Sequence, residues 1–285
     1  TDRHLIAMQP VAAPYGEARD DYQIFSELAR RLGREAAFTE GRDARGWLEH
    51  LYAQLQEKLA AHQVGLPDFA AFWQEGVVTL PQLQDGGRMM NAFRADPTAH
   101  PLPTPTGKIQ IASDAIAGFG YEDCPGHPVW RAPREQPSAS YPFWLIANQP
   151  ATRLHSQLDF GDYSRSGKRN GREVCSLHPL DAQRLGIADN DVIELYNARG
   201  HLLASAALTE AIRPGVVRLP TGAWYDPVDP AAARPLCRHG NPNVLTQDIG
   251  TSALAQGCTG QIAVVNVRKY IGDAPPVAAF TPPQG

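Results

Sequence analysis

Apolar residues recur every three or four positions in the first third of the chain, which is the spacing of helices with one apolar face. Residues 19–33 place Ile24 and two leucines on one face, with acidic residues early, arginines late and Gly33 after the last apolar position. Residues 43–64 repeat the pattern, and residues 68–76 show a shorter version of it. We predict three helices here, and we expect their apolar stripes to pack into a core.

The middle of the chain differs because residues 95–140 are dense in proline. Proline lacks the backbone donor that helices and sheets need, so long regular elements are disfavoured. Residues 107–113 alternate apolar and polar side chains well enough to predict one strand. Residues 121–140 predict a long covering loop or linker, and we place a domain boundary near residue 140.

Short β-rich runs separated by glycine, asparagine, aspartate or proline follow this boundary. They lie at residues 141–148, 191–200, 201–209, 215–222 and 261–270. Residues 178–187 predict a two-turn helix capped by His178, and residues 197–200 predict a hairpin turn. Many short strands with one small helix favour a closed barrel. The predicted fold class is α+β, with a helical and proline-rich segment over residues 1–140 and a β-barrel domain over residues 141–285.

The composition disfavours several classes of protein. A formal net charge of −4 at pH 7 and a pI of about 6.1 provide no basic surface for nucleic acid or anionic lipid. With 43% hydrophobic residues and no apolar run of about 18 or more, we predict a globular protein without a membrane span. The four cysteines lie far apart with no C-x-x-C pair, so we expect free thiols rather than a zinc, iron–sulfur or redox site.

A first polar cluster directly follows the apolar run at 143–147. Arg153, His155, Ser156 and Gln157 place hydrogen-bonding groups where a predicted buried strand ends. A loop at a strand end can aim such groups at a ligand, so we expect a polar ligand here. A neighbouring histidine and serine rarely reach the geometry of a nucleophile and its base, and the chain has no G-x-S-x-G elbow, so hydrolase chemistry is disfavoured.

A second polar cluster occupies residues 239–257. Its amides, hydroxyls and carboxylate belong to Asn241, Asn243, Thr246, Gln247, Asp248, Thr251, Ser252 and Gln256. If the segment is buried, most of these groups need partners, and a large polar cofactor would supply them. A structural loop whose side chains cap its own backbone is the alternative, and the sequence leaves both open. Nearby, Trp224 and Tyr225 either wall a substrate pocket or pack at a strand end.

Four segments carry a resemblance to a known family. They are RLHSQLD at residues 153–159, HPLDAQRLGIADNDVIELYNARG at 178–200, GAWYDP at 222–227 and GNPNVLTQDIGTSALAQG at 240–257. Their order resembles the C-terminal region of molybdopterin oxidoreductases of the dimethyl sulfoxide reductase family, in the branch that reduces S-oxides and N-oxides. Within that branch GAWYDP and GNPNVLT look most like biotin sulfoxide reductases, and the resemblance covers essentially the whole chain.

The resemblance implies a double-psi β-barrel that closes over a bis(molybdopterin guanine dinucleotide) molybdenum cofactor. The implied reaction is reduction of an S-oxide or N-oxide, such as biotin, methionine or dimethyl sulfoxide or trimethylamine oxide, by oxygen-atom transfer to molybdenum. Carried over position by position, the implied cofactor-binding residues are Asn148, Arg153, Leu154, His155, Ser156, Asn243, Gly260 and Gln261. Trp224 and Tyr225 are expected near the substrate funnel.

In that family the metal ligand lies upstream of any segment that resembles this chain. The resemblance therefore implies no catalytic and no metal-ligating residue here, and a chain that is inactive by itself. The expected partners are the N-terminal part of the parent enzyme, an electron donor and a small S-oxide or N-oxide, in the cytoplasm or, as in exported relatives, the periplasm. The alternatives are the same domain of a formate dehydrogenase or nitrate reductase, and a non-catalytic barrel that acts as a scaffold module.

Overall fold

The computed structural model describes residues 3–81, 89–257 and 261–282. The chain divides into two compact units, Thr1–Ile109 and Gln110–Gly285. This division lies before the boundary that we placed near residue 140, and the two-domain assignment stays a prediction. Of the helices in the described ranges, none is long and apolar enough to cross a membrane.

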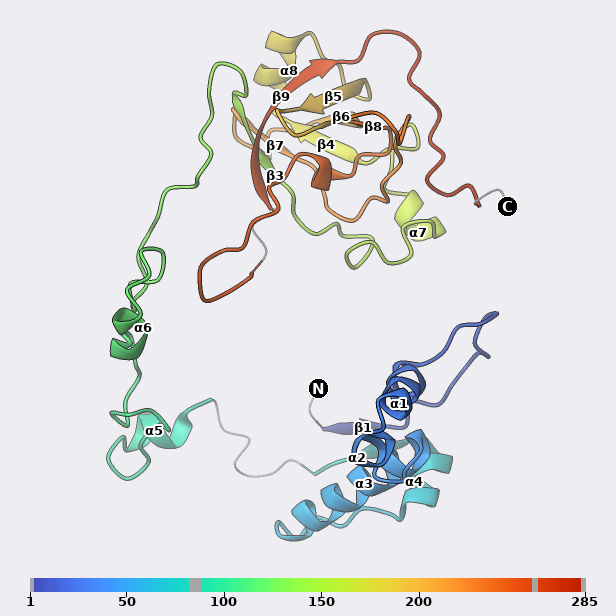
Figure 1. Ribbon diagram of the computed structural model, residues 1–285, viewed down its shortest axis with the longest axis vertical. Helices are drawn as coiled ribbons and strands as arrows, with labels where there is room; N and C mark the ends of the chain where they lie inside the picture. The colour runs from blue at the N-terminus through green and yellow to red at the C-terminus, as the bar shows by residue number, and fades with distance from the viewer. Residues whose placement is uncertain (1–2, 82–88, 258–260, 283–285) are drawn as a thin grey trace. The chain divides into compact units, whose positions relative to one another are not determined.

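The first unit is mainly helical (Figure 1, blue to cyan). Its elements are β1 (His4–Ile6), α1 (Asp21–Arg31), α2 (Glu35–Thr39), α3 (Ala44–Ala60), α4 (Phe69–Glu75), β2 (Val77–Thr79) and α5 (Asn91–Ala95). An aspartate caps α1, α3 and α4: Asp20, Asp43 and Asp68 each accept a hydrogen bond from the backbone N–H three residues later, at 2.8, 2.7 and 2.8 Å. The three predicted helices are confirmed at α1, α3 and α4.

The apolar stripe of α1 is exposed. Ile24, Leu28 and Leu32 are 46%, 49% and 68% exposed. The small core of this unit forms instead between α3 and α4, where the rings of Tyr52 and Phe72 stack with centroids 4.9 Å apart. Our expectation that α1 buries its stripe is wrong for the described residues, because none of the described elements covers that face.

We predicted a strand over residues 107–113, which lie across the division between the two units. These residues form no strand, and Ile109 and Ile111 are 60% and 77% exposed. Alternation alone is insufficient because a strand needs a neighbour to satisfy its backbone groups, and no described strand pairs with this segment. The short helix α6 (Asp114–Gly118) follows, and residues 121–140 contain no helix or strand, as predicted.

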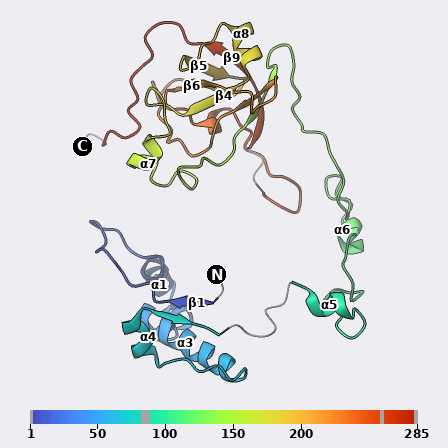
Figure 2. The same ribbon diagram turned by 180° about the vertical axis from the view of Figure 1, so that it is seen from behind.

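Six strands of the second unit close into a barrel (Figures 1 and 2). They are β3 (Phe143–Ile146), β4 (Val174–Leu177), β5 (Val192–Tyr196), β6 (His201–Leu208), β7 (Val216–Arg218) and β9 (Ile262–Lys269). The order around the ring is β4, β7, β3, β9, β5 and β6, and the pairing of β6 with β4 closes it. The pairs β3–β7 and β4–β6 are parallel and the other four are antiparallel, while the short strand β8 (Leu236–Cys237) pairs with β6 from outside the ring. With the helical first unit, this confirms the predicted α+β class with a C-terminal double-psi β-barrel.

Aliphatic side chains from every strand fill the barrel. The fully buried ones include Leu145, Leu177, Ile193, Leu195, Leu202, Val217 and Val265. The predicted helix α8 (Pro179–Leu185) packs Ala182 against this core at one end of the barrel, and α7 (Asp162–Arg165) lies at the other end in both views (Figures 1 and 2). His178 caps α8 as predicted, since its Nδ1 accepts from the backbone N–H of Leu180 at 3.2 Å.

The predicted hairpin joins β5 to β6 through a turn that starts at Asn197. The backbone N–H of Asn197 donates to the carbonyl oxygen of Gly200 at 3.0 Å. The buried side chain of Asn197 donates from Nδ2 to the carbonyl oxygens of Leu245 and Val264, at 2.8 and 3.0 Å. One amide therefore ties the hairpin to β9 and to the segment that follows β8.

Replacing Asn197 with alanine should destabilise the barrel. The change leaves Val264 O without this donor, whereas Leu245 O keeps a hydrogen bond of 2.8 Å from Arg199 Nε, and a buried carbonyl oxygen without a donor costs about 1–3 kcal/mol. Urea denaturation measures the resulting loss in the free energy of unfolding. Gln183→Ala, at an exposed position on α8, is the control and should change that free energy by less than about 0.5 kcal/mol. Equal stability of the two variants would contradict the role given to Asn197.

Candidate functional site

The carboxyl ends of β3 and β7 and the amino end of β9 lie at the same end of the barrel. Beyond β3, the backbone N–H of Ala147 donates to Gln261 O at 2.9 Å, and Asn148 O accepts from the backbone N–H of Thr221 at 2.8 Å. The start of β7 lies at the opposite end, where Asp181 of α8 accepts a backbone hydrogen bond at 2.8 Å from the residue that precedes that strand. We call the end where β3 and β7 finish and β9 begins the α7 end of the barrel, and the opposite end the α8 end.

Two predicted site residues become neighbours at the α7 end, because Asn148 follows β3 and Gln261 precedes β9. The Oδ1 atom of Asn148 is buried and accepts no hydrogen bond from any described residue. Gln261 is exposed. Gly260, also predicted here, lies outside the described residues. A buried amide oxygen without a donor, close to an exposed amide, is a place where a polar ligand can supply hydrogen-bond partners.

Arg153 belongs to the polar loop that follows β3, and its guanidinium is buried. The side chain is only 2% exposed. It lies 2.7 Å from Glu173 Oε2 and 3.3 Å from Asp159 Oδ1, and it donates to the carbonyl oxygen of Thr221 at 2.7 Å. Carboxylates already pair with its guanidinium, so the observed role of Arg153 is to hold the loop in place. Its predicted role as a cofactor ligand stays a prediction.

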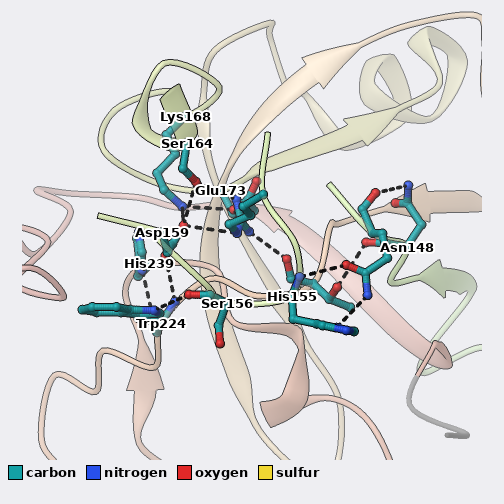
Figure 3. A network of polar contacts seen from close by, with 12 residues as sticks. Asn148, His155, Ser156, Asp159, Ser164, Lys168, Glu173, Trp224 and His239 are labelled. Atoms are coloured by element: carbon teal, nitrogen blue, oxygen red, sulfur yellow. Dashed lines mark hydrogen bonds and ion pairs between the residues drawn. The ribbon is translucent and has the colours of Figure 1, made fainter. Parts of the chain in front are cut away.

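Lys168 completes a buried charge network. It pairs with Asp159 and Glu173 (Figure 3), and both carboxylates also pair with Arg153. Its Nζ lies 2.8 Å from Asp159 Oδ1 and 3.1 Å from Glu173 Oε2. Burial acts to raise the pKa of Asp159. Hydrogen bonds from Lys168 and from the backbone N–H of Trp224, with the charges of Lys168 and Arg153, outweigh burial and lower that pKa overall. Two cations thus face two carboxylates, and the network carries no net charge.

The loop exposes three further predicted residues, Leu154, His155 and Ser156. His155 has a left-handed backbone with φ of 51°. The side chain of Gln149 holds it twice: Oε1 accepts from the backbone N–H of His155 at 3.2 Å, and Nε2 lies 3.0 Å from His155 Nδ1. The indole Nε1 of Trp224 donates to Ser156 O at 2.8 Å. The backbone of this loop is therefore fixed, while its side chains remain accessible to a ligand.

Trp224 joins the two polar clusters that the sequence keeps far apart. Its backbone N–H donates to Asp159 Oδ2 at 3.0 Å, and its carbonyl oxygen accepts from His239 Nδ1 at 2.9 Å. Figure 3 shows Asp159, His239 and Trp224 side by side at this point. The loop after β3 and the start of the stretch 239–257 therefore meet at the α7 end of the barrel.

The side chains of Trp224 and Tyr225 are 37% and 48% exposed. The indole of Trp224 packs between the rings of Phe160 and Phe280, with centroid distances of 5.6 and 5.7 Å. The packing role that the sequence left open is thus observed for Trp224. Their placement near a substrate funnel stays a prediction.

Several polar side chains of residues 239–257 cap the backbone of that same stretch. Asn241 Oδ1 accepts from the backbone N–H of Asn243 at 2.9 Å, and Thr251 Oγ1 donates to Ala255 O at 2.7 Å. The structural alternative therefore accounts for part of this cluster. Asn243 differs from these residues, because its side chain is exposed and forms no hydrogen bond with the described part of the chain.

A cleft of about 930 Å³ opens beside the start of β9. Its lining includes Arg131, Arg134, Glu135, Gln247, Thr251 and Gln261. Arg199 holds Glu135 by two contacts of 2.5 and 3.0 Å, and this hydrogen bonding lowers the pKa of Glu135 despite its partial burial. A cleft of this volume can hold a bulky small molecule, and its lining offers amide, hydroxyl and guanidinium groups.

Five of the six barrel strands, the first two residues of β9 and both polar clusters fall within the match to a known family. Residues 143–263 match the molydopterin dinucleotide binding domain. The barrel of this chain belongs to that family. The chain is 42% identical over its whole length to a dimethyl sulfoxide/trimethylamine N-oxide reductase of Cereibacter sphaeroides, and 44% identical over 95% of its length to a biotin sulfoxide reductase of the same organism. The predicted resemblance to this branch is confirmed.

The chain spans about a third of the length of these relatives, 35% and 36%. A trimethylamine-N-oxide reductase of Salmonella typhimurium is 41% identical over 99% of the chain and 34% of its own length. Among solved structures, acetylene hydratase from Pelobacter acetylenicus covers 94% of this chain with a TM-score of 0.63 and 20% identity. At that identity the likeness supports the fold alone.

Sequence reasoning did not single out Lys168, Glu173 or His239. Each has charged or polar neighbours along the chain, as exposed residues do, yet the three side chains are 3%, 6% and 0% exposed. Glu173 directly precedes β4, a strand of four residues that we did not predict. Recognising β4 would have placed Glu173 at the α7 end and marked it as a buried carboxylate in need of a cation.

Gly222 should be irreplaceable under the loop that follows β3. Its φ is +91°, and a Cβ atom there would overlap the carbonyl oxygen of His155. Gly215→Ala is the control, because Gly215 has a φ of +79° and open space around it, so only backbone strain of about 1–2 kcal/mol is expected. Gly222→Ala should lose at least about twice that free energy of unfolding, because a backbone atom must move as well. Equal losses in denaturant titrations would refute this packing.

His239 should make the barrel less stable as the pH falls below 7. Burial, and then the charge of Lys168, lower the pKa of His239 below its ordinary value of 6.5. Between pH 6.5 and the lowered pKa, the unfolded chain binds a proton at this histidine and the folded chain does not. The free energy of unfolding therefore decreases as the pH falls through this range. His239→Gln should flatten the dependence of the unfolding free energy on pH in this window. The exposed His127, changed to glutamine, should leave the dependence as it is; an unchanged slope in His239→Gln would disprove the assignment.

Proposed function

We propose that this chain is the cofactor-binding part of a molybdenum-dependent reductase of S-oxides or N-oxides. The observation that carries the proposal is the meeting of both polar clusters at the α7 end of a molydopterin dinucleotide binding barrel. The similarity of the whole chain to reductases of dimethyl sulfoxide, trimethylamine N-oxide and biotin sulfoxide supports the substrate class.

The residues present fit a pterin-based cofactor with a nucleotide. A pterin carries amide-like donors and acceptors along its edge. These match Asn148 Oδ1, which has no partner among the described residues, and the exposed amides of Asn243 and Gln261. The fixed backbone and exposed side chains of residues 154–156 offer further contacts. We infer that these residues hold a bis(molybdopterin guanine dinucleotide) molybdenum cofactor.

When bound, that cofactor supplies the two-electron redox chemistry on the oxygen of the substrate. The contribution of this chain is to bind the cofactor, orient it and exclude water from one side of it. Within the described ranges, no group of three or more histidine, cysteine, aspartate or glutamate side chains is arranged to hold a metal ion. We propose that the metal ligand, the catalytic residues and the docking site of the electron donor belong to other parts of the protein, and that this chain alone is inactive. The cytoplasm remains our predicted compartment.

Purified full-length protein should contain molybdenum and release a guanine nucleotide on denaturation. It should oxidise a reduced dye when biotin sulfoxide, methionine sulfoxide, dimethyl sulfoxide or trimethylamine oxide is added. Activity with formate or nitrate alone would identify another molybdopterin enzyme. Folded protein without molybdenum and without activity would favour a scaffold module and contradict the proposal.

Asn243→Ala and Gln261→Ala should each lower the molybdenum content of the full-length protein without lowering its stability. Both side chains are exposed, so removing them leaves the barrel intact but removes hydrogen bonds worth about 0.5–1.5 kcal/mol each to the cofactor. Metal analysis of folded protein, after dialysis against buffer, measures the loss. Gln183→Ala, an exposed amide at the α8 end, is the matched control. Full molybdenum content in both variants would remove these residues from the site.

A further inference from the structure

Both ends of the loop after β3 are held by one charge network. We define the loop tip as residues 154–158, which lie between Arg153 and Asp159. These two residues pair with each other, and Lys168 and Glu173 join them from outside the loop. All four side chains are 6% exposed or less. The loop tip is therefore closed at its base by four buried charges.

The backbone of the loop tip is strained at two residues. His155 and Leu158 have φ angles of 51° and 53°. This left-handed conformation costs a residue other than glycine about 1–2 kcal/mol. Burial does not compensate, because Leu154 and Leu158 are 64% and 68% exposed. Such a conformation persists only where the surrounding structure imposes it.

The network specifies geometry more than it stabilises the fold. Burying two cations and two carboxylates costs hydration free energy that their attraction roughly offsets, so apolar replacements of such groups are often neutral or stabilising. With no net charge, the network also adds little long-range attraction for an anionic ligand. What it does supply is position: Arg153 binds Thr221 O at 2.7 Å and Asp159 accepts from the backbone N–H of Trp224 at 3.0 Å. These contacts seat the loop on the segment after β7.

We propose that Asp159, Lys168 and Glu173 are positioning residues that hold the loop tip in its cofactor-binding conformation before the cofactor arrives. The proposal rests on the proposed function, since it takes the loop tip as part of the cofactor site. A loop that is already ordered loses little conformational freedom on binding, so it retains its ligand longer than a mobile loop does. The three residues act through the backbone of the loop tip, and they do not contact the cofactor themselves.

The test compares variants of the network in the full-length protein. Asp159→Asn and Lys168→Met each remove one charge, whereas Lys168→Arg keeps the charge and should restore the pairing. Asp181→Asn is the matched control, because Asp181 is also a fully buried carboxylate that accepts from a backbone N–H, but it lies at the α8 end of the barrel. If Asp159→Asn does not fold, the comparison of Lys168→Met with Lys168→Arg still decides the test.

Two readouts separate positioning from plain stability. Hydrogen–deuterium exchange of the loop-tip peptide in cofactor-free protein should become at least about tenfold faster in Asp159→Asn and Lys168→Met. Release of molybdenum from loaded protein should accelerate by a similar factor in the same two variants, on the order of tenfold. Lys168→Arg and Asp181→Asn should stay within about twofold of the wild type in both readouts, even where Asp181→Asn lowers the unfolding midpoint equally.

Three results bear on the proposal in different ways. Equal acceleration of molybdenum release by Asp159→Asn and Asp181→Asn, at equal loss of stability, would reduce the network to a structural role and overturn the proposal. Slow exchange of the loop tip in every variant would also overturn it. A wild-type protein with a protected loop tip but no molybdenum would overturn the proposed function, and the positioning role would fall with it.

Discussion

The parallel pairing of β4 with β6 is the contact on which the second unit depends. It joins Val174–Leu177 to Ser205–Leu208 residue by residue and turns an open sheet into a closed ring. Closure also brings Glu173 into position, because its backbone N–H donates to His239 O at 3.1 Å and its carbonyl oxygen accepts from Ser205 N–H at 2.9 Å. The carboxylate that pairs with Arg153 and Lys168 is thus set by the same strand that closes the barrel.

Polar residues at the α7 end have two separate tasks. Those that are buried, such as Asp159 and Lys168, satisfy one another and hold the backbone. Those that are exposed or lack partners among the described residues, such as Asn148 Oδ1 and the side chain of Asn243, are the ones that we propose contact a ligand. Burial decides between the tasks, because a buried charge without a partner is costly while an exposed amide is not.

Local patterns predicted local structure well. The apolar repeat located α1, α3 and α4, and the Asn197 turn located the β5–β6 hairpin. Features that depend on distant partners could not be predicted. Residues 107–113 alternate like a strand but find no partner among the described strands, and the stripe of α1 is apolar but finds no cover there.

The candidate site follows the same rule. The sequence located both polar clusters, and the fold brings them together at Trp224. It could not show that Arg153 is neutralised by Glu173, twenty positions along the chain, because that pairing exists only once β4 has closed the barrel. The resemblance to a reductase branch supplied the nature of the ligand, which burial and hydrogen bonding alone leave open.

Hydrogen–deuterium exchange of the full-length protein, with and without its molybdenum cofactor, tests most directly whether the α7 end is where the cofactor binds. Loading should slow exchange in peptides that cover residues 148–159 and 239–250, and it should leave peptides of α8 unchanged. Protection confined to the α8 end, or no protection anywhere in the barrel, would contradict the account.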